Sequence, residues 1–386
     1  MKILIIIGGF FPGVKFGGPP VSVNNFCTLM QDDECYIVTK NHDMGETEPY
    51  KDIKPGWNDR GNCIVKYLSD SEYCYKGFTE AINEVAPDVL YLQSLFADCI
   101  VPCLMLAKKN NIPVLLAPRG ELCPGAMKKK YKKLPYISFL RASGLVRDIS
   151  FQYTSQDELE GIRKYFGKVI RCYFLTNVPS MPSENYDHPE KKPGEAKLVF
   201  ISRIVPKKNL RKAIDLIAGI RGKLTFDIYG PIEDYDYWDE CLRAVKELPN
   251  SIKVSYKGTV GQGEAAKTFA NYDCFVFPTL SENYGHVIAE SLSAGCPVLV
   301  SDQTPWDFNE FENAGTAIPI EEFKQWVETL QSIVDSDTTK MLNRRQAAID
   351  YFNSKVQFDK LRRRYLKALL ELTNSNMTRL DVDGHV

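Results

Sequence analysis

Short runs of apolar residues alternate with longer segments of helical periodicity along most of the chain. In the first half the longer segments predict helices at residues 20–31, 78–85 and 97–110. The apolar runs between them predict strands at 2–7, 35–39, 63–67, 88–92 and 113–117. This alternation is typical of a parallel sheet with helices on both faces.

A polar segment at 177–195, rich in proline, serine, asparagine and charge, interrupts this pattern. The alternation then restarts, with strands predicted at 197–202, 224–229, 252–256, 274–278 and 297–301. The sequence therefore predicts two Rossmann-like α/β domains, residues 1–176 and 196–355, joined by a linker at 177–195. Ligands of open parallel sheets bind beyond the carboxyl ends of the strands, so we expect a binding cleft between the two halves.

The end of the chain has a different pattern. Residues 356–373 have helical periodicity, and the polar residues 374–386 predict a frayed tail. A length of 386 residues is consistent with two domains, because single hydrophobic cores rarely extend over so long a chain.

Composition narrows the class of protein. The chain is 44% hydrophobic and 25% charged with a net charge of -1, which predicts a globular protein and argues against broad nucleic-acid binding. No apolar run approaches the roughly 18 residues needed to cross a bilayer. Eleven cysteines without a C-x-x-C pair favour a reduced, cytoplasmic chain. The four histidines lie far apart, which argues against a zinc site.

The strongest candidate site is residues 278–301, PTLSENYGHVIAESLSAGCPVLVS. A predicted strand leads into a loop with Glu282, and Glu290 follows in a predicted helix. Carboxylates of this kind accept hydrogen bonds from the hydroxyls of a sugar or, in a bidentate manner, of a ribose. The alternative is a helix cap at Glu282 and a solvated Glu290, although Glu290 has apolar neighbours. The backbone at the helix start can bind phosphate, so the donor-contact candidates here also include Asn283, Tyr284, Gly285, His286 and Val287.

Residues 200–210, FISRIVPKKNL, follow the first predicted strand of the second half. Arg203 and Lys208, with Lys207 beside them, are expected to leave the strand end toward the cleft. A planar guanidinium and a compact ammonium suit a diphosphate. Basic loop residues are usually solvated, so this motif gains weight only together with the two carboxylates.

These motifs resemble those of the family 4 retaining glycosyltransferases, which have the two-Rossmann-domain (GT-B) fold. The likeness rests on GGP at 17–19, APRGEL at 117–122, SRIVPKKN at 202–209, Glu282 through Glu290, and SAGCPV at 293–298. They occur in the family's order across roughly 300 residues, which argues against chance similarity.

The resemblance implies a UDP- or GDP-sugar donor in the C-terminal domain and an acceptor facing the N-terminal domain. It implies that Arg203 and Lys208 hold the donor diphosphate, that Glu290 holds the ribose and that Glu282 contacts the donor sugar. Arg203, Lys208 and Glu282 are therefore the catalytic candidates. It also implies that the last helix crosses back to the N-terminal domain. We expect no metal or other cofactor, and the resemblance implies a role in bacterial surface polysaccharide or lipopolysaccharide biosynthesis.

The segment PGVKFGGPP at 12–20 lacks G-x-G-x-x-G, which argues against a nicotinamide or flavin dinucleotide. We expect Gly17 and Gly18 to let the backbone approach the sugar-phosphate bond, with N–H groups available at a helix start. The alternative is an ordinary strand-to-helix turn.

In APRGEL, Arg119, Gly120 and Glu121 follow a predicted strand and are expected to contact the acceptor or a phosphate. Many relatives have a histidine where this chain has Arg119. The difference removes a candidate proton carrier, so we expect the leaving phosphate itself to take the proton of the acceptor hydroxyl.

Two acidic motifs and one basic motif have competing interpretations. Asp234-Tyr235-Asp236 has the D-x-D form of metal-binding glycosyltransferases, but we expect it at a helix start. Asp381-x-Asp383 lies in the predicted tail.

The basic segment KKKYKK at 128–133 favours contact with the inner, anionic face of a membrane or, equally, a solvated helix face. Its lysines are Lys128, Lys129, Lys130, Lys132 and Lys133.

The function that these motifs predict is transfer of a sugar from a nucleoside diphosphate to a hydroxyl of a saccharide, which can be lipid-linked. One alternative is a non-hydrolysing sugar-nucleotide epimerase, which would need cleft acids and bases that the few histidines do not supply. Another is a catalytically silent nucleotide-sugar-binding subunit. A glycogen-type phosphorylase would require a lysine for pyridoxal phosphate and a longer chain.

Overall fold

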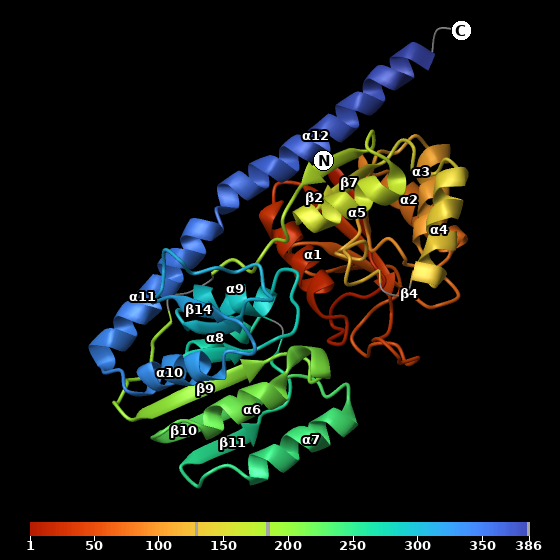
Figure 1. Cartoon of the computed structure of the whole chain (residues 1–386). Helices are drawn as coiled ribbons and strands as arrows, with labels where there is room; N and C mark the ends of the chain where they lie inside the picture. Colours follow the sequence, from red (N-terminus) through yellow and green to blue (C-terminus); the bar gives the residue numbers. More distant parts are fainter. Residues whose placement is uncertain (128–129, 183–185, 262, 384–386) are drawn as a thin grey trace. The chain divides into compact units, whose positions relative to one another are not determined.

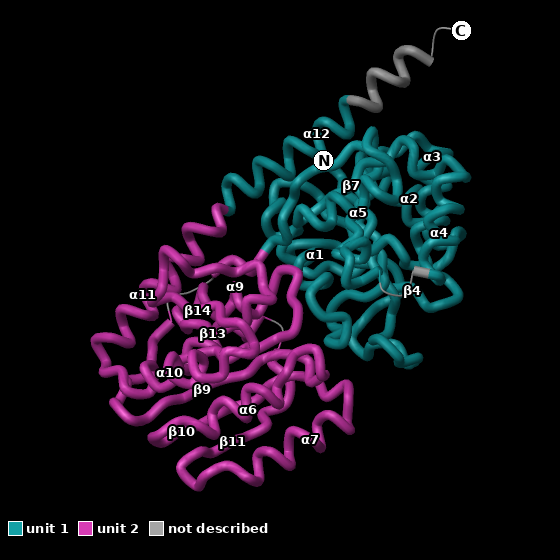
Figure 2. Tube along the Cα trace, in the orientation of Figure 1, with its two compact units in different colours: residues 1–178, 358–386 teal, residues 179–357 magenta. Residues whose placement is uncertain are grey.

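A computed structural model describes residues 1–127, 130–182, 186–261 and 263–383, with side chains for all of these except Lys130 and residues 375–383. The chain forms two compact units (Figure 2). Unit 1 consists of Met1–Val178 and Phe358–Val386, and unit 2 of Pro179–Gln357.

Unit 1, in which Figure 1 labels strands β2, β4 and β7, contains a sheet that is parallel except for β3. The order of its strands is β3-β4-β2-β1-β5-β6-β7-β8. Its strands are β1 (Lys2–Ile6), β2 (Glu34–Lys40), β3 (Trp57–Asp59), β4 (Ile64–Leu68), β5 (Val89–Gln93), β6 (Val114–Ala117), β7 (Ser150–Tyr153) and β8 (Arg171–Phe174). The five strands that the sequence predicts in this half are confirmed, and β3, β7 and β8 are additional.

Strand β1 explains why both faces of this sheet are covered. All its aliphatic residues are buried, with Ile3 and Ile5 in one core and Leu4 and Ile6 in the other. Side chains alternate between the faces of a strand, so such a continuous apolar run requires helices on both sides. Helices α1 (Gly18–Leu29) and α12 (Phe358–Asp383) contribute to the first core. The second core includes residues of α2 (Tyr75–Val85), α3 (Ile100–Lys109), α4 (Lys130–Ala142) and α5 (Gln156–Phe166).

Unit 2 contains a parallel sheet in the order β11-β10-β9-β12-β13-β14. Its strands are β9 (Glu195–Ile201), β10 (Lys223–Tyr229), β11 (Ile252–Tyr256), β12 (Cys274–Phe277), β13 (Val298–Ser301) and β14 (Gly315–Ile318). The five predicted strands are confirmed, and β14 is additional. This order places the topological switch point, where ligands of doubly wound sheets bind, between β9 and β12.

The helices of unit 2 connect these strands. They are the short 3₁₀ helix η1 (Pro206–Lys208), α6 (Leu210–Ala218), α7 (Tyr235–Lys246), α8 (Ala265–Phe269), α9 (His286–Ser293), α10 (Phe323–Val334) and α11 (Thr338–Lys355). Helix α6 packs against α7 and α10, and α9 packs against α8 and α11.

The predicted frayed tail from residue 374 is wrong in part, because α12 continues to Asp383. The helix is anchored on unit 1 by buried residues, among which Tyr365 makes the polar contacts. The Tyr365 hydroxyl donates to the carbonyl of Thr176 at 2.9 Å, and the amide of Gln152 donates to the same hydroxyl at 3.1 Å. Once its first turns are fixed in this way, a helix propagates through polar residues at little cost.

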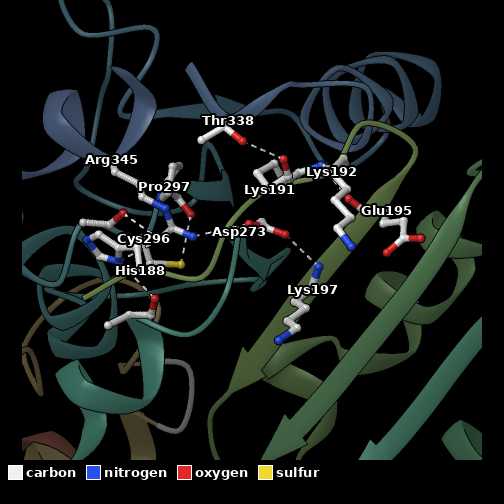
Figure 3. A network of polar contacts seen from close by, with 12 residues as sticks. His188, Lys191, Lys192, Glu195, Lys197, Asp273, Cys296, Pro297, Thr338 and Arg345 are labelled. Atoms are coloured by element: carbon white, nitrogen blue, oxygen red, sulfur yellow. Dashed lines mark hydrogen bonds and ion pairs between the residues drawn. The ribbon is translucent and has the colours of Figure 1, made fainter. Parts of the chain in front are cut away.

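The predicted linker at 177–195 is also wrong in part, because most of its described residues pack into unit 2 (Figure 3). Residues 183–185 lie outside the described residues. Lys191 is 4% exposed, and its ammonium donates to the carbonyls of Lys192, Glu195 and Val334. His188 Nδ1 lies 3.0 Å from the carbonyl of Ala270. The polar composition of this segment therefore satisfies buried backbone groups as well as solvent.

No helix within the described residues is long and apolar enough to cross a membrane.

Candidate active site

The sheet order of unit 2 brings together the two motifs that the sequence singles out. Residues 202–209 follow β9 and residues 278–285 follow β12, and these strands are neighbours. The two loops are joined by backbone and side-chain hydrogen bonds. The N–H of Leu280 donates to the carbonyl of Lys207 at 2.9 Å, and the amide of Asn209 donates to the carbonyl of Pro278 at 2.9 Å.

Lys208 and Glu282 form a largely buried ion pair between these loops. The side chains are 11% and 18% exposed, respectively. The Lys208 ammonium also lies 5.3 Å from the centre of the Phe277 ring. Burial lowers the pKa of Lys208, the Glu282 carboxylate opposes this shift, and the nearby charges of Arg203 and Lys207 add to it. Three cations are thus gathered close enough to repel one another, an arrangement that an anionic ligand would stabilise.

Arg203 is turned toward β10. Its guanidinium pairs with Glu233 at 3.0 Å, and its side chain is 38% exposed. Because an exposed ion pair of this kind contributes little stability, the guanidinium can exchange Glu233 for a ligand at low cost.

The loop after β12 is held in place by contacts from the segment after β13. The N–H of Glu282 donates to the carbonyl of Gln303 at 2.9 Å, and the indole of Trp306 donates to the carbonyl of Tyr284. The Tyr284 ring contacts Trp306 at 5.8 Å and His286 at 4.9 Å between ring centres. Tyr284 and His286 therefore form one side of an aromatic cluster.

Helix α9 begins at His286, directly after this loop. Gly285 precedes it with φ 78°, in the left-handed region, and a β-carbon there would lie 2.8 Å from the side chain of Ile288. Glycine is therefore required for the turn. It places the first backbone N–H groups of α9, including that of Val287, immediately after Asn283 and Tyr284.

Glu290 lies one turn further along α9. Its carboxylate accepts a hydrogen bond from the hydroxyl of Ser180 at 3.2 Å. Burial raises the pKa of Glu290 to about 7, and the hydrogen bond from Ser180 acts in the opposite direction. At neutral pH the carboxyl is therefore poised between its charged and neutral forms, and donors from a ligand would favour the charged form.

In unit 1, Gly17 precedes α1 with φ 71°, and Gly18 is the first residue of the helix. The next two residues are prolines, which have no backbone N–H. Prolines suit a helix start, but they supply no donors. The expected contact of this helix start with the sugar-phosphate bond stays a prediction, and Gly18 is the residue that offers an N–H before the two prolines.

The guanidinium of Arg119 forms its hydrogen bonds with residues of unit 1. It donates to the amide oxygen of Gln93, to the hydroxyl of Ser22 at 3.2 Å, and to the amide oxygen of Asn177. The backbone of Arg119 has φ 54°, in the left-handed region. A side chain with this many internal bonds has little left for an acceptor or a phosphate.

Gly120 and Glu121 are likewise held by internal contacts. The N–H of Gly120 donates to Glu158 at 2.6 Å. The Glu121 carboxylate accepts from the hydroxyl of Ser94 at 2.6 Å and from the N–H of Leu95 at 2.6 Å. Burial raises the pKa of Glu121, and these donors oppose the shift.

A cavity of about 540 Å³ lies in unit 1, lined by residues that follow β1 and β5. We call it the β1–β5 cavity. Strands β1 and β5 are neighbours at the switch point of this sheet. Its lining includes Gly8, Gly9, Phe16, Gln93, Phe96, Arg119 and Glu121.

Of the predicted basic segment, Lys128 and Lys129 and the side chain of Lys130 lie outside the described residues. Lys132 is exposed. Lys133 is turned inward, because its ammonium donates to the carbonyls of Glu121 at 3.3 Å and Ala126 at 3.1 Å. One lysine of the segment thus closes a loop of unit 1.

The D-x-D motif at 234–236 is a helix start, as the sequence analysis predicts. Asp234 is the N-cap of α7, and its side chain accepts from the N–H of Tyr237 at 3.0 Å. The side chains of Asp381 and Asp383 lie outside the described part. Within the described residues, no group of three or more His, Cys, Asp or Glu side chains is arranged to hold a metal ion.

Comparison with known families identifies unit 2. Residues 183–351, which make up nearly all of this unit, match the family described as glycosyl transferases group 1. Unit 2 is a group 1 glycosyltransferase domain. The β9 and β12 loops with Arg203, Lys208, Glu282 and Glu290 all lie within the matched residues.

Solved glycosyltransferase structures extend the likeness to the whole chain. Anabaena HepE, solved with UDP and glucose, is 14% identical with a TM-score of 0.69, and the match covers 96% of this chain and 100% of that one. Sucrose-phosphate synthase from Thermosynechococcus elongatus is 13% identical with a TM-score of 0.69, covering 97% and 99%. The trehalose-6-phosphate synthase OtsA is 12% identical with a TM-score of 0.69, covering 96% and 99%. The chain therefore has the GT-B fold of these structures. No curated protein sequence matches the chain.

Several residues of these sites are not predicted from the sequence. Ser180, the partner of Glu290, lies in a segment whose composition suggests a linker. Glu233 and Trp306 give no local signal, because only the sheet order brings them to Arg203 and Tyr284. Gln93 had a detectable signal, since it is a polar residue at the end of a buried strand.

Proposed function

We propose that this glycosyltransferase moves a sugar from a nucleoside diphosphate to a hydroxyl of a saccharide acceptor, with retention at the anomeric carbon. The observation that carries the proposal is the buried Lys208–Glu282 pair, with Arg203 beside it, at the switch point of the group 1 domain. This arrangement offers cations for a diphosphate and a carboxylate for sugar hydroxyls at one sheet edge.

In the proposed reaction, each of these residues has a separate role. The bond between the anomeric carbon and the diphosphate oxygen breaks, and a bond from the acceptor oxygen to the same carbon forms on the same face. The proton of the acceptor hydroxyl passes to an oxygen of the departing diphosphate. Arg203, Lys208 and the N–H groups at the start of α9 stabilise the negative charge that develops there. Glu290 accepts the ribose hydroxyls, and Glu282 contacts the transferred sugar.

Metal-independent transfer is part of the proposal. Fixed cations stabilise the leaving group as a divalent ion would, and Lys208 is held in place by Glu282 before the donor arrives. Addition of EDTA is therefore expected to leave transfer unchanged, and loss of activity that Mg²⁺ restores would contradict this part.

The donor is tested by ligand-induced stabilisation of the full-length protein. Wild-type protein and Lys208→Met are heated with UDP-glucose, UDP-N-acetylglucosamine and GDP-mannose in turn. A ligand bound only to the folded state raises the unfolding temperature, so at least one donor is expected to stabilise the wild type. The variant should lose most of that increase, whereas Lys246→Met, an exposed lysine of α7, should keep it. Absence of stabilisation by every donor would refute the proposal.

Retention is tested on the product of transfer. The anomeric configuration of the new linkage, measured by NMR, is expected to equal that of the donor. Inversion would contradict the proposed stereochemistry but not donor binding. An epimerised donor formed without any acceptor would instead identify the sugar-nucleotide epimerase.

We further propose that α4 contacts an anionic membrane surface, where a lipid-linked acceptor of surface polysaccharide synthesis would be met. The support is an exposed apolar stripe along the helix, in which Tyr131 is 71%, Leu134 38% and Phe139 50% exposed, with the exposed Lys132 beside it. Helices that lie on membranes combine such a stripe with cationic residues.

This contact is tested by co-sedimentation with phosphatidylglycerol vesicles. Replacing Tyr131 and Phe139 together by serine should abolish binding. Val169→Ser, which removes a fully exposed valine elsewhere in unit 1, should not change it. Equal binding of both variants would refute the membrane proposal.

A further inference from the structure

The β1–β5 cavity carries an inference about the acceptor, and it rests on the proposed function, which places the acceptor on unit 1. Gln93 is 1% exposed and lines this cavity. Its amide oxygen accepts from Nε of Arg119 at 2.8 Å and from a second guanidinium nitrogen. A guanidinium only donates hydrogen bonds, so the oxygen of the Gln93 amide must be the atom that faces it.

The nitrogen of the Gln93 amide is therefore left for another partner. It is buried and has no hydrogen-bond partner among the described residues. The hydroxyl of Tyr73, which also lines the cavity and is 7% exposed as a residue, is paired only weakly, with the thiol of Cys99. Buried polar groups are almost always paired, so an unpaired amide nitrogen beside this weakly paired hydroxyl points to a ligand that supplies oxygen atoms.

The rest of the lining is largely apolar and aromatic. Phe16, Tyr73 and Phe96 contribute rings, and the main-chain glycines after β1 leave room beside them. Small-molecule sites commonly combine such walls with a few placed polar groups. A sugar ring has matching chemistry, because its hydroxyls form hydrogen bonds while its C–H face packs against aromatic rings.

The charges at the cavity disfavour a strongly anionic ligand. Lys40 pairs with Asp70 at 2.8 Å, and Arg119 uses its donors on neutral oxygens of the protein. Asp98 and Glu121 add two carboxylates to the lining. Within the lining, the charges of Lys40 and Arg119 are thus matched by two carboxylates, and His42, which also lines the cavity, shares Asp70 with Lys40. The lining therefore offers no net positive charge to offset the burial of a phosphate or a carboxylate.

We infer that the β1–β5 cavity binds an uncharged hexose of the acceptor, and that Gln93 and Tyr73 are its specificity-determining residues. Arg119 acts as a positioning residue, since it fixes which end of the Gln93 amide is offered to the sugar. A phosphorylated sugar or a uronic acid in this position is disfavoured.

The test compares matched neutral and charged sugars on the full-length protein. Glucose, galactose and mannose, their 6-phosphates and their uronic acids are titrated in the presence of saturating UDP, or GDP if that nucleotide binds. Binding is followed by saturation-transfer NMR. In at least one set the neutral sugar should bind about tenfold or more tightly than its charged counterparts, because a charge would be buried without a partner.

Variants locate that binding in the cavity. Gln93→Met should weaken it about tenfold, and Tyr73→Phe about fivefold, as expected for one lost hydrogen bond each. Tyr50→Phe is the matched control, because its hydroxyl is buried without a partner among the described residues but does not line the cavity. Arg119→Met should weaken sugar binding while leaving nucleotide affinity intact, which a general loss of structure would not do.

Tighter binding of a charged sugar, binding that survives both Gln93→Met and Tyr73→Phe, or no binding by any neutral sugar would each overturn the inference. Nucleotide affinity is measured on the same samples. If nucleotides bind and the sugars fail, only the acceptor inference fails, whereas failure of all nucleotides would refute the proposed function itself.

Discussion

If Glu290 holds the donor ribose as proposed, donor binding is linked to a single proton. Burial raises the pKa of Glu290 from 4.5 to about 7, while the hydroxyl of Ser180 donates a hydrogen bond that favours the charged form. If ribose hydroxyls donate to this carboxylate, the bound state requires it to be ionised. Donor binding must then release a proton whenever the free protein is protonated at this position.

The size of the effect follows from the pKa. One pH unit below a pKa of about 7, roughly nine in ten molecules are protonated, so the apparent donor affinity at pH 6 should be about tenfold weaker than at pH 8. UDP-glucose or GDP-mannose is the suitable probe, because the charge of their phosphates does not change over this range. Calorimetry in buffers of different ionisation enthalpy should detect close to one proton released at pH 6 and almost none at pH 8.

The same shift affects stability with a defined sign. A carboxyl whose pKa is raised on folding binds its proton more tightly in the folded state, so stability falls as pH rises from about 4.5 to about 7. The loss amounts to about 3 kcal/mol. Glu290→Gln should remove this dependence and stabilise the free protein at pH 8, while weakening donor binding. Donor affinity that is equal at pH 6 and pH 8 in the wild type would refute the reasoning.

Three further predictions concern other parts of the two units. Lys208→Met should lower kcat by roughly 10²–10³, measured by product formation at saturating donor, because it removes one electrostatic donor to the leaving group. In the double variant Lys208→Met/Glu282→Gln, no carboxylate is left buried without a partner, so the unfolding free energy lost in Lys208→Met should be recovered. The kcat should stay low in this double variant. Recovery of kcat would contradict the catalytic role of Lys208. Arg119→Met should lower the unfolding free energy by about 3 kcal/mol in urea titrations, because three oxygen acceptors lose their charged donor. If Arg119 instead served only to bind a ligand, its replacement would change the unfolding free energy little. Asp234→Ala should cost about 1 kcal/mol of stability through the lost N-cap and leave transfer in the presence and absence of Mg²⁺ unchanged; loss of activity there would restore the metal interpretation.

The local pattern of apolar and polar residues was sufficient to predict the strands and helices that carry the candidate sites. The aliphatic runs of β1, β5, β9 and β12 are short, continuous and bounded by turn residues, so their strand identity needs no tertiary information. Glu282 and Glu290 are predicted as site residues in the same way, because each follows a predicted strand end at a short distance along the chain. The helix start at Asp234 also followed from the chemistry of N-caps.

Partners from distant parts of the chain were not predictable. Arg119 was expected to face a ligand, but its guanidinium is used by Gln93, Ser22 and Asn177, which come from three separate segments. The polar segment before β9 looked like a linker because composition does not distinguish solvated lysines from a buried one such as Lys191, whose ammonium is bound by three carbonyls.

The sequence by itself determined that the chain forms two parallel α/β units and which loops bear charge, since apolar periodicity and glycine or proline punctuation are local properties. The tertiary structure alone decided which loops meet, because strand order is set by how helices cover the sheet and not by order along the chain. That order placed β9 beside β12, and so Lys208 against Glu282. It also placed β1 beside β5, and so Gln93 in a cavity with its amide nitrogen unpaired.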